Sequence, residues 1–424
     1  MKSFPRSCSY PLADEIVITG TGAVCSLGNS VREITLGLLS GKSGISEITD
    51  FDAGGFGCRA ARVKDPPAIK TDIHPHLAKT MGKHLSLLLI STRQALIEAG
   101  IGSGNFDPED MGFFAGMGTV DYRLDDLLPA VAKSLGPDGE LDYGRFFSAG
   151  YQEIYPLWPL GMLNNVAFCQ AAIHFGLRGE NAVFAPHGDA GVKAVAEAVK
   201  VLDEGKARVA IAGGVSEEIS LQSLARAGLK GLIRSAKSLS VDPAAQGAAT
   251  EVFLGECGAM LVLEPISGAT ARKANMLARV AGFGFSCHRD GKSGSASTRA
   301  ICSAMEGSLS QAGIGPGQVD AVMLGGCGRN EIEAVGRTFG TGAKAPITVS
   351  TVGSLGETFA AGPILNTAIG LEIASWDKLP RGICPSGGCS PVDRSKPARF
   401  MVNGISYEGM CSSMIIEKTA GKSI

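Results

Sequence analysis

Short apolar runs alternate with amphipathic stretches along most of this 424-residue chain. Residues 182–185 form one such run, a tight turn follows at 186–188, and apolar positions then recur at helical spacing over 192–202. Short apolar runs bounded by turn residues indicate buried strands, and apolar spacing of three and four indicates a helix. The pattern therefore predicts a strand, a sharp elbow and a helix, with Asp189 as the N-cap residue.

The same alternation occurs twice along the chain and predicts two similar halves. Expected strands of the first half are 15–24, 111–117, 182–185, 208–215 and 253–264. Expected strands of the second half are 279–285, 319–324, 347–350 and 409–418, the last resembling 257–264. Expected helices include 30–39, 81–99, 160–175, 192–202 and 298–312. Strands that alternate with helices in this way predict an α/β fold, with helices on both faces of a mixed sheet in each half.

Changes in composition predict the domain limits. A polar stretch at 265–275 separates a first half at 14–265 from a second half at 276–418. Residues 120–165 combine mixed charge with scattered aromatic residues. We interpret this segment as an insertion into the first half that forms a cap over the sheet.

Composition excludes several classes of function. The chain is 45% hydrophobic and 19% charged, as ordinary globular proteins are, and its net charge of −2 argues against binding to nucleic acids or membrane surfaces. Eleven scattered cysteines include no Cys-x-x-Cys pair, which predicts buried free thiols in a reducing compartment rather than disulfides or a metal site. No apolar run is long enough to span a bilayer. We expect a cytoplasmic protein without a metal or cofactor.

The predicted elbow has a geometry suited to acyl transfer. A nucleophile at its tip would stand above the sheet, beside backbone N–H groups and the positive end of a helix. The residue at the tip, however, is Gly188, which has no side chain.

Short motifs follow one another in a fixed order from residue 16 to residue 418. They are Val-Ile-Thr-Gly-Thr-Gly at 17–22, Gly-Lys-Ser-Gly-Ile at 41–45, Phe-Gly-Leu-Arg-Gly-Glu-Asn at 175–181, Ala-Gly-Gly at 212–214 and Leu-Gly-Glu at 254–256. In this order and at these distances, they resemble the elongating β-ketoacyl-acyl-carrier-protein synthases. The resemblance implies a thiolase-like fold, in which two mixed five-stranded sheets pack as α-β-α-β-α layers, and it implies a dimer.

The resemblance also implies where catalytic residues should lie. Such enzymes use a cysteine at the elbow, two histidines in glycine-rich turns of the second half, and a lysine. Counted along the motifs, the cysteine position falls on Gly188, the histidine positions on Gly325 and Glu357, and the lysine position on Val352. Because all four reacting groups are absent, the sequence argues against Claisen condensation by this chain.

The remaining candidates lie in the loops expected to surround this centre. His187 is either a base or nucleophile, or a turn histidine, and the sequence places no acidic partner beside it. Cys327 and Cys411 are either displaced thiol nucleophiles or inert buried cysteines. Glu357 either accepts a hydrogen bond in the pocket or faces water.

The closing loop of relatives, Gly-Phe-Gly-Gly, corresponds here to residues 406–409. The resemblance therefore implies that Tyr407 and Gly409 belong to the substrate pocket. Tyr407 takes the position that gates the acyl tunnel in relatives, although packing in the core explains it equally well.

Three functions follow from these observations. The first is a non-catalytic partner of a Cys-bearing ketosynthase in fatty acid or polyketide biosynthesis, similar to a chain-length factor, although such subunits commonly carry glutamine where this chain has Gly188. The second is an acyltransferase or thioesterase-like enzyme with altered chemistry on acyl thioesters. The third is an acyl-binding homodimer. An acyl carrier protein is an additional expected partner.

Overall fold

The structure is a computed structural model that describes most of residues 14–419. Its gaps are residues 54, 56–58, 65, 68–81, 103, 123, 186, 234–251, 290–295, 327, 343–344 and 376–397.

Ten strands of the described chain form one mixed sheet, in the order β10-β9-β11-β12-β8-β1-β7-β6-β4-β5. The first half contributes β1 (Ile16–Cys25), β4 (Met111–Met117), β5 (Asn181–Phe184), β6 (Val209–Val215) and β7 (Cys257–Pro265). The second half contributes β8 (Ala278–Cys287), β9 (Ala321–Met323), β10 (Ile347–Val349), β11 (Arg399–Ile405) and β12 (Met410–Lys418). The order β1-β7-β6-β4-β5 matches β8-β12-β11-β9-β10, which confirms two similar halves.

The two sets of five strands meet at a short junction. β1 pairs with β8 only through Val17 with Arg279 and Ile18 with Ala278, whereas β1 pairs with β7 along its whole length. The Leu277 N–H also donates to the Ile18 carbonyl. The two expected five-stranded sheets are therefore joined edge to edge, because β1 and β8 lie antiparallel where both strands begin.

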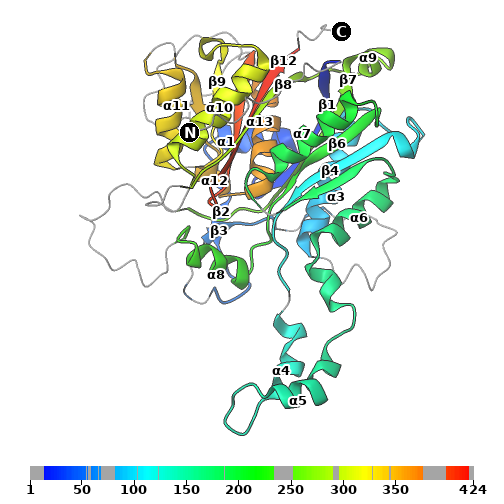
Figure 1. Ribbon diagram of the computed structural model, residues 1–424, viewed down its shortest axis with the longest axis vertical. Coiled ribbons are helices and arrows are strands. Elements are labelled where there is room, and N and C mark those ends of the chain that lie inside the picture. The colour runs from blue at the N-terminus through cyan, green and yellow to red at the C-terminus, as the bar shows by residue number, and fades with distance from the viewer. Residues whose placement is uncertain are drawn as a thin grey trace, which may run out of the picture.

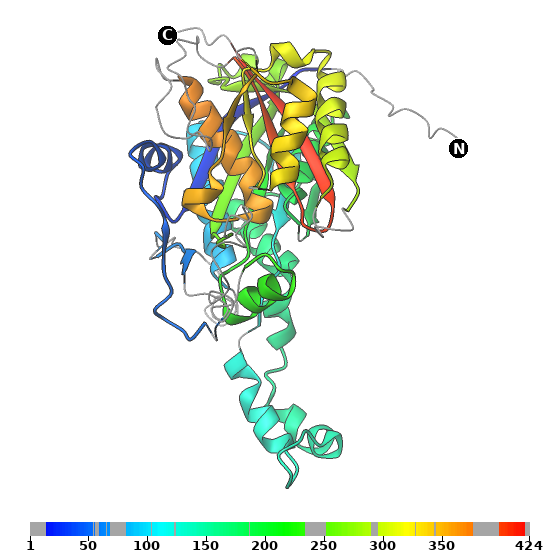
Figure 2. The ribbon, with the colours of Figure 1, turned by 90° about the vertical axis from the view of Figure 1, so that its left-hand side faces the viewer.

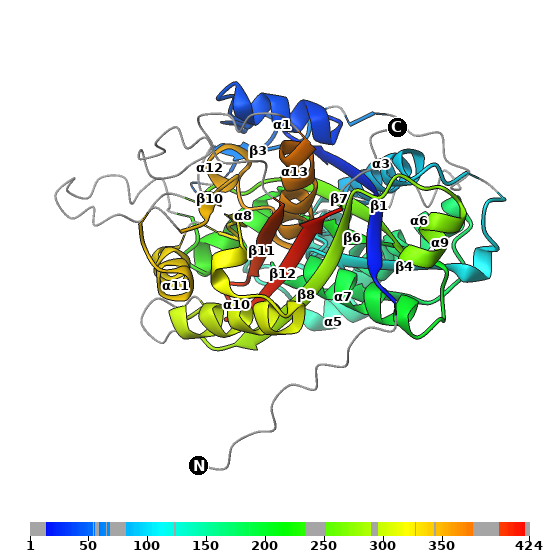
Figure 3. The ribbon, with the colours of Figure 1, turned by 90° about the horizontal axis from the view of Figure 1, so that it is seen from above.

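Helices form three layers around the strands. The central layer holds α7 (Ala190–Asp203) and α13 (Gly362–Ser375), whose apolar residues share one core with β1, β7 and β12. One outer layer holds α3 (Lys83–Glu98) and α6 (Asn164–Phe175), and the other holds α10 (Thr298–Ala312) and α11 (Arg329–Phe339). Figure 3 shows α10 and α13 on opposite faces of β11 and β12. The arrangement is the expected α-β-α-β-α fold of the thiolase type.

Local signals placed several of these elements correctly. The helix expected at 30–39 is α1 (Val31–Leu39), and the hydroxyl of Ser30 caps it by accepting the Glu33 N–H at 3.2 Å. The helix expected at 81–99 is α3, which ends before Gly100. The remaining short elements are β2 (Ile45–Glu47), β3 (Arg59–Ala61), α8 (Leu221–Leu229), α9 (Ile266–Ala271) and α12 (Val352–Leu355).

The segment interpreted as a cap does not cover the sheet. Residues 121–163, which we call the arm, hold α4 (Leu128–Ser134) and α5 (Tyr143–Ser148), and these helices project away from the strands (Figures 1 and 2). The aromatic residues that suggested a cap lie on the arm surface, with Tyr143 67% and Phe147 69% exposed. The prediction was wrong because aromatic side chains in a sequence do not reveal whether the folded chain buries them.

Cysteine burial differs in part from the prediction. Cys25, Cys257 and Cys411 are buried, whereas Cys169 and Cys287 are exposed. The described cysteines are free thiols. Among the residues that the structure describes, no helix has the length and apolar character needed to cross a bilayer.

Candidate functional site

The elbow forms where the sequence predicts it, but Asp189 does not cap the helix. α7 begins directly after Asp189, whose backbone is already helical, with φ −89° and ψ −7°. Its buried carboxylate instead forms an ion pair with Lys193, one turn along, at 2.6 Å. The N-cap prediction was therefore wrong about the side chain, because capping requires extended backbone at this position.

The tip of the elbow has no room for a side chain. A Cβ atom placed on Gly188 would lie 2.3 Å from the carbonyl oxygen of Ile405, which is closer than real Cβ contacts come. Ile405 is the last residue of β11, so the obstacle is backbone rather than a movable side chain. Glycine at 188 is thus what allows the end of β11 to lie directly against the elbow.

Gly325, the first histidine position that the resemblance implies, also has no room for a side chain. A Cβ atom on Gly325 would lie 2.6 Å from the carbonyl oxygen of Asn403, also in β11. Between these two contacts lies Gly404, whose own Cβ would approach the carbonyl oxygen of Gly188 to 3.0 Å. The end of β11 therefore lies against both positions at which the resemblance implies a cysteine and a histidine.

A buried carboxyl group binds the turn at Gly325. Glu331 is 2% exposed and accepts the N–H groups of Gly325 at 2.9 Å and Gly326 at 3.0 Å. The side-chain amide of Asn403 donates a third hydrogen bond at 2.9 Å. Sequence reasoning missed Glu331, although its place on the buried face of α11, with Ala334 and Val335, was a signal that could have identified it.

Glu357 is buried rather than facing water. It is 4% exposed, it accepts the Phe359 N–H at 3.0 Å, and the Tyr407 hydroxyl lies 3.5 Å from its other oxygen. Phe359 has φ 45°, a left-handed conformation that is strained for an aromatic residue. Val352, at the lysine position, is buried and begins α12.

Glu331 and Glu357 line one pocket, which is open to solvent, together with Asn330, Ser406 and Tyr407; we call it the carboxyl cavity. Burial raises the pKa of Glu331 to about 7, against the hydrogen bonds that favour its ionised form. Burial also raises the pKa of Glu357 to about 7, and the nearby Glu331 adds to this rise. Both groups can therefore exchange protons near neutral pH.

The cysteine candidates provide no thiolate in the described structure. Cys411 is 1% exposed, and burial raises its pKa to about 12, with the carboxylates of Glu331 and Asp189 adding to the rise. A thiol in this environment stays protonated and is a poor nucleophile. Cys327 lies outside the described residues.

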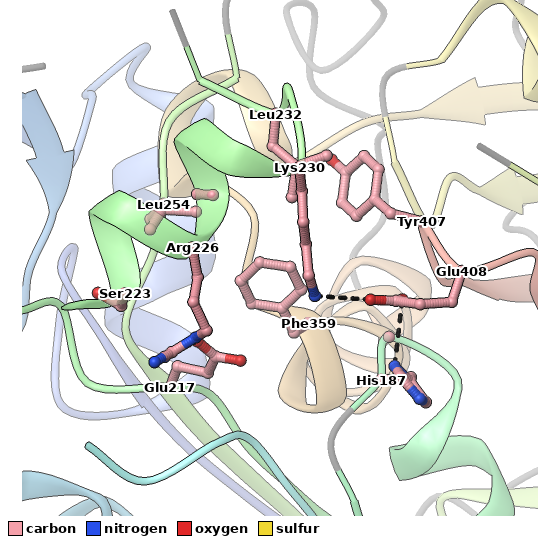
Figure 4. Close-up of a pocket in the computed structure, with 12 residues that line it drawn as sticks. His187, Glu217, Ser223, Arg226, Lys230, Leu232, Leu254, Phe359, Tyr407 and Glu408 are labelled. Atoms are coloured by element: carbon pink, nitrogen blue, oxygen red, sulfur yellow. Dashed lines mark hydrogen bonds and ion pairs between the residues drawn. The ribbon is translucent and has the colours of Figure 1, made fainter. Parts of the chain in front are cut away.

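A second pocket, which is open to solvent, lies between the elbow and α8; we call it the α8 cavity. His187 lines it and gains an acidic partner that the sequence did not place, since Nδ1 of His187 lies 3.1 Å from Oε2 of Glu408 (Figure 4). Lys230 binds the other oxygen of Glu408 at 2.6 Å. Burial acts to raise the pKa of Glu408, but hydrogen bonds from Lys230 and Ser406 outweigh it and lower the pKa to about 2.

The β11–β12 turn separates the two cavities. Tyr407 lines both cavities, and its ring lies edge-on to that of Phe359 at 6.4 Å. Gly409 has φ +98° and lies against the backbone of Arg289, so it serves the turn and is not part of the lining of either cavity. Within the described chain, no three metal-binding side chains gather at one point.

Comparison with known proteins identifies the family to which this chain belongs. The model for the β-ketoacyl synthase N-terminal domain matches residues 13–269, and the model for the C-terminal domain matches residues 277–373. The chain belongs to the β-ketoacyl synthase family. It is 28% identical over 427 residues to 3-oxoacyl-[acyl-carrier-protein] synthase 2 of Coxiella burnetii, a match that covers 95% of this chain and 98% of that protein.

Two solved structures share the fold of this chain. The ishigamide ketosynthase/chain length factor matches with a TM-score of 0.75 at 21% identity, and the match covers 96% of this chain and 100% of that chain. The second structure is a type II polyketide synthase acyl-carrier protein in complex with its ketosynthase bound to the hexaketide. It matches with a TM-score of 0.72 at 18% identity, and the match covers 96% of this chain and 100% of that chain.

Restoring a cysteine at the elbow should not restore a nucleophile. We expect Gly188→Cys to lose roughly 1–3 kcal/mol of unfolding free energy, because its Cβ must displace the backbone at Ile405. We also expect no covalent acyl adduct, by intact-protein mass spectrometry, after incubation with an acyl-CoA. Gly353→Cys is the matched control, since no atom lies within 4 Å of a Cβ there. An acylated Gly188→Cys as stable as wild type would contradict this account of the elbow.

The buried carboxyl groups should make stability fall as pH rises. A group whose pKa is raised from 4.5 to about 7 keeps its proton longer in the folded state, so its stabilisation is full below about pH 4.5 and is lost towards pH 7. Glu357→Gln mimics the protonated form. Relative to wild type, its unfolding free energy should rise between pH 4.5 and 8, by about 3 kcal/mol at most.

Denaturant titrations at several pH values measure this difference, with exposed Glu47→Gln as the control. A difference between Glu357→Gln and wild type that does not change with pH would show that Glu357 is not held protonated.

Proposed function

We propose that this chain is a subunit without condensing activity that pairs with a Cys-bearing ketosynthase of fatty acid or polyketide biosynthesis, as a chain-length factor does. The observation that carries the proposal is the contact between Gly188 and the carbonyl of Ile405. Acyl transfer through a thioester needs a nucleophilic side chain at this point, and backbone occupies the space that its Cβ requires. The second contact, at Gly325, supports the same conclusion.

The arm supports a partner chain. Its exposed apolar and aromatic side chains include Leu128, Tyr143, Phe147 and Tyr151, each at least half exposed. A projecting element that leaves so many large apolar side chains in water is typical of a surface covered by another protein. β5 is also the last strand at its end of the described sheet, so one side of its backbone is available for pairing.

The similar structures support this kind of partner. One of them is described as a ketosynthase/chain length factor, and another as an acyl-carrier protein in complex with its ketosynthase. The chain retains the fold, and backbone occupies the space for a side chain at the tip of its elbow. Both features fit a subunit that binds an active partner and contributes to the shape of the complex.

Co-expression with a Cys-bearing ketosynthase, tagged on one chain only, tests the proposal. We expect a stable one-to-one complex by light scattering, and a change in product chain length relative to the ketosynthase alone. Homodimers of this chain that leave the ketosynthase unbound and its product unchanged would instead support the acyl-binding scaffold and contradict the proposal.

The arm should determine the affinity of this complex. We expect the double variant Tyr143→Ser and Phe147→Ser to weaken association by about tenfold or more, because aromatic anchors dominate interfaces. Ile97→Ser is the matched control, since Ile97 is 67% exposed on α3, away from the arm. Equal affinities of both variants, measured by surface plasmon resonance, would exclude the arm as the interface.

A further inference from the structure

The α8 cavity contains a charged pair that a purely structural subunit does not require. His187 stands at the start of α7 with Nδ1 on the carboxylate of Glu408, and neither residue is deeply buried, with side chains 25% and 34% exposed. A carboxylate on one ring nitrogen fixes the orientation of the imidazole. Glu408 is itself held in place by Lys230 and Ser406.

The rest of the cavity combines an apolar wall with polar groups. Leu232, Leu254 and Phe359 line the cavity and offer contacts suited to an acyl chain, and the charged residues Glu217, Arg226 and Lys230 line it as well. His187 and Gly188, which precede the fourteen-residue helix α7, also line it. The first N–H groups of a helix have no intrahelical acceptor and lie at its positive end, where they favour negative charge. His187, its acidic partner Glu408 and these apolar side chains therefore line the same cavity (Figure 4).

We propose that His187, oriented by Glu408, is a general base that activates water to hydrolyse acyl thioesters bound in the α8 cavity. This activity goes beyond the proposed partner role, and it requires neither a thiol nucleophile nor a second chain. The pair was outside the reach of sequence reasoning because Glu408 lies in the other half of the chain.

The reaction balances without a further reagent. The imidazole of His187 removes a proton from water while the water oxygen attacks the thioester carbonyl carbon. The resulting oxyanion lies near the positive end of α7. The carbon–sulfur bond then breaks, the protonated imidazole returns its proton to the departing thiolate, and the products are a carboxylic acid and a thiol. Glu408 keeps its charge throughout and acts as a positioning residue.

The test uses the full chain alone with octanoyl-CoA. Since the chain has eleven cysteines, the released octanoate and CoA are quantified by mass spectrometry rather than with a thiol reagent. We expect His187→Ala to reduce the rate by about 100-fold and Glu408→Gln by about tenfold. His174→Ala, on α6 and outside the α8 cavity, is the matched control and should keep the wild-type rate.

The variant Glu408→Asp separates positioning from folding. It keeps a carboxylate that can accept a hydrogen bond from Nδ1 of His187, so it should recover part of the rate that Glu408→Gln loses. If the two variants are equally stable in thermal unfolding but equally slow, Glu408 does not act by positioning His187.

Release of octanoate no faster than in buffer, or an unchanged rate in His187→Ala, would overturn the hydrolase proposal. Neither result would affect the partner role, which depends on complex formation with a ketosynthase. Conversely, His187-dependent hydrolysis by a chain that binds no ketosynthase would leave the hydrolase proposal standing alone.

Discussion

The close packing of the end of β11 against two glycine turns is the constraint on which the site depends. Ile405 lies against Gly188 and Asn403 against Gly325, so backbone fills the space where the family resemblance implies reacting side chains. Backbone cannot move aside as a flexible side chain can, because β11 is held in the sheet by both β9 and β12. The close approach of β11 therefore requires that positions 188 and 325 carry no side chain.

Buried carboxyl groups take the place of the expected bases. Glu331 binds the N–H groups of the Gly325 turn, and Asn403 and Ser413 extend the hydrogen-bonded network behind it. Glu357 lines the same cavity. Both acids hold their protons up to near neutral pH, so the interior avoids two uncompensated negative charges. A centre of this kind favours binding and proton exchange over thiolate chemistry.

Most of the fold could be predicted from local pattern, because β1, β6, β7 and α7 carry continuous apolar runs or clear helical spacing. The elbow and the absence of a nucleophile at Gly188 were also predictable. The position of the arm was not, because exposed aromatic residues such as Tyr143 look like core residues in a sequence. The pairing of His187 with Glu408 depends on tertiary packing between the two halves, which no local signal encodes.

The central proposal is that this chain does not form a carbon–carbon bond by itself. The most direct measurement incubates the purified chain with an acyl thioester and a malonyl thioester of acyl carrier protein, and follows both the intact mass of the chain and the products. The account predicts no acylated chain and no β-ketoacyl product. A β-ketoacyl product formed by this chain in the absence of any other ketosynthase would contradict it.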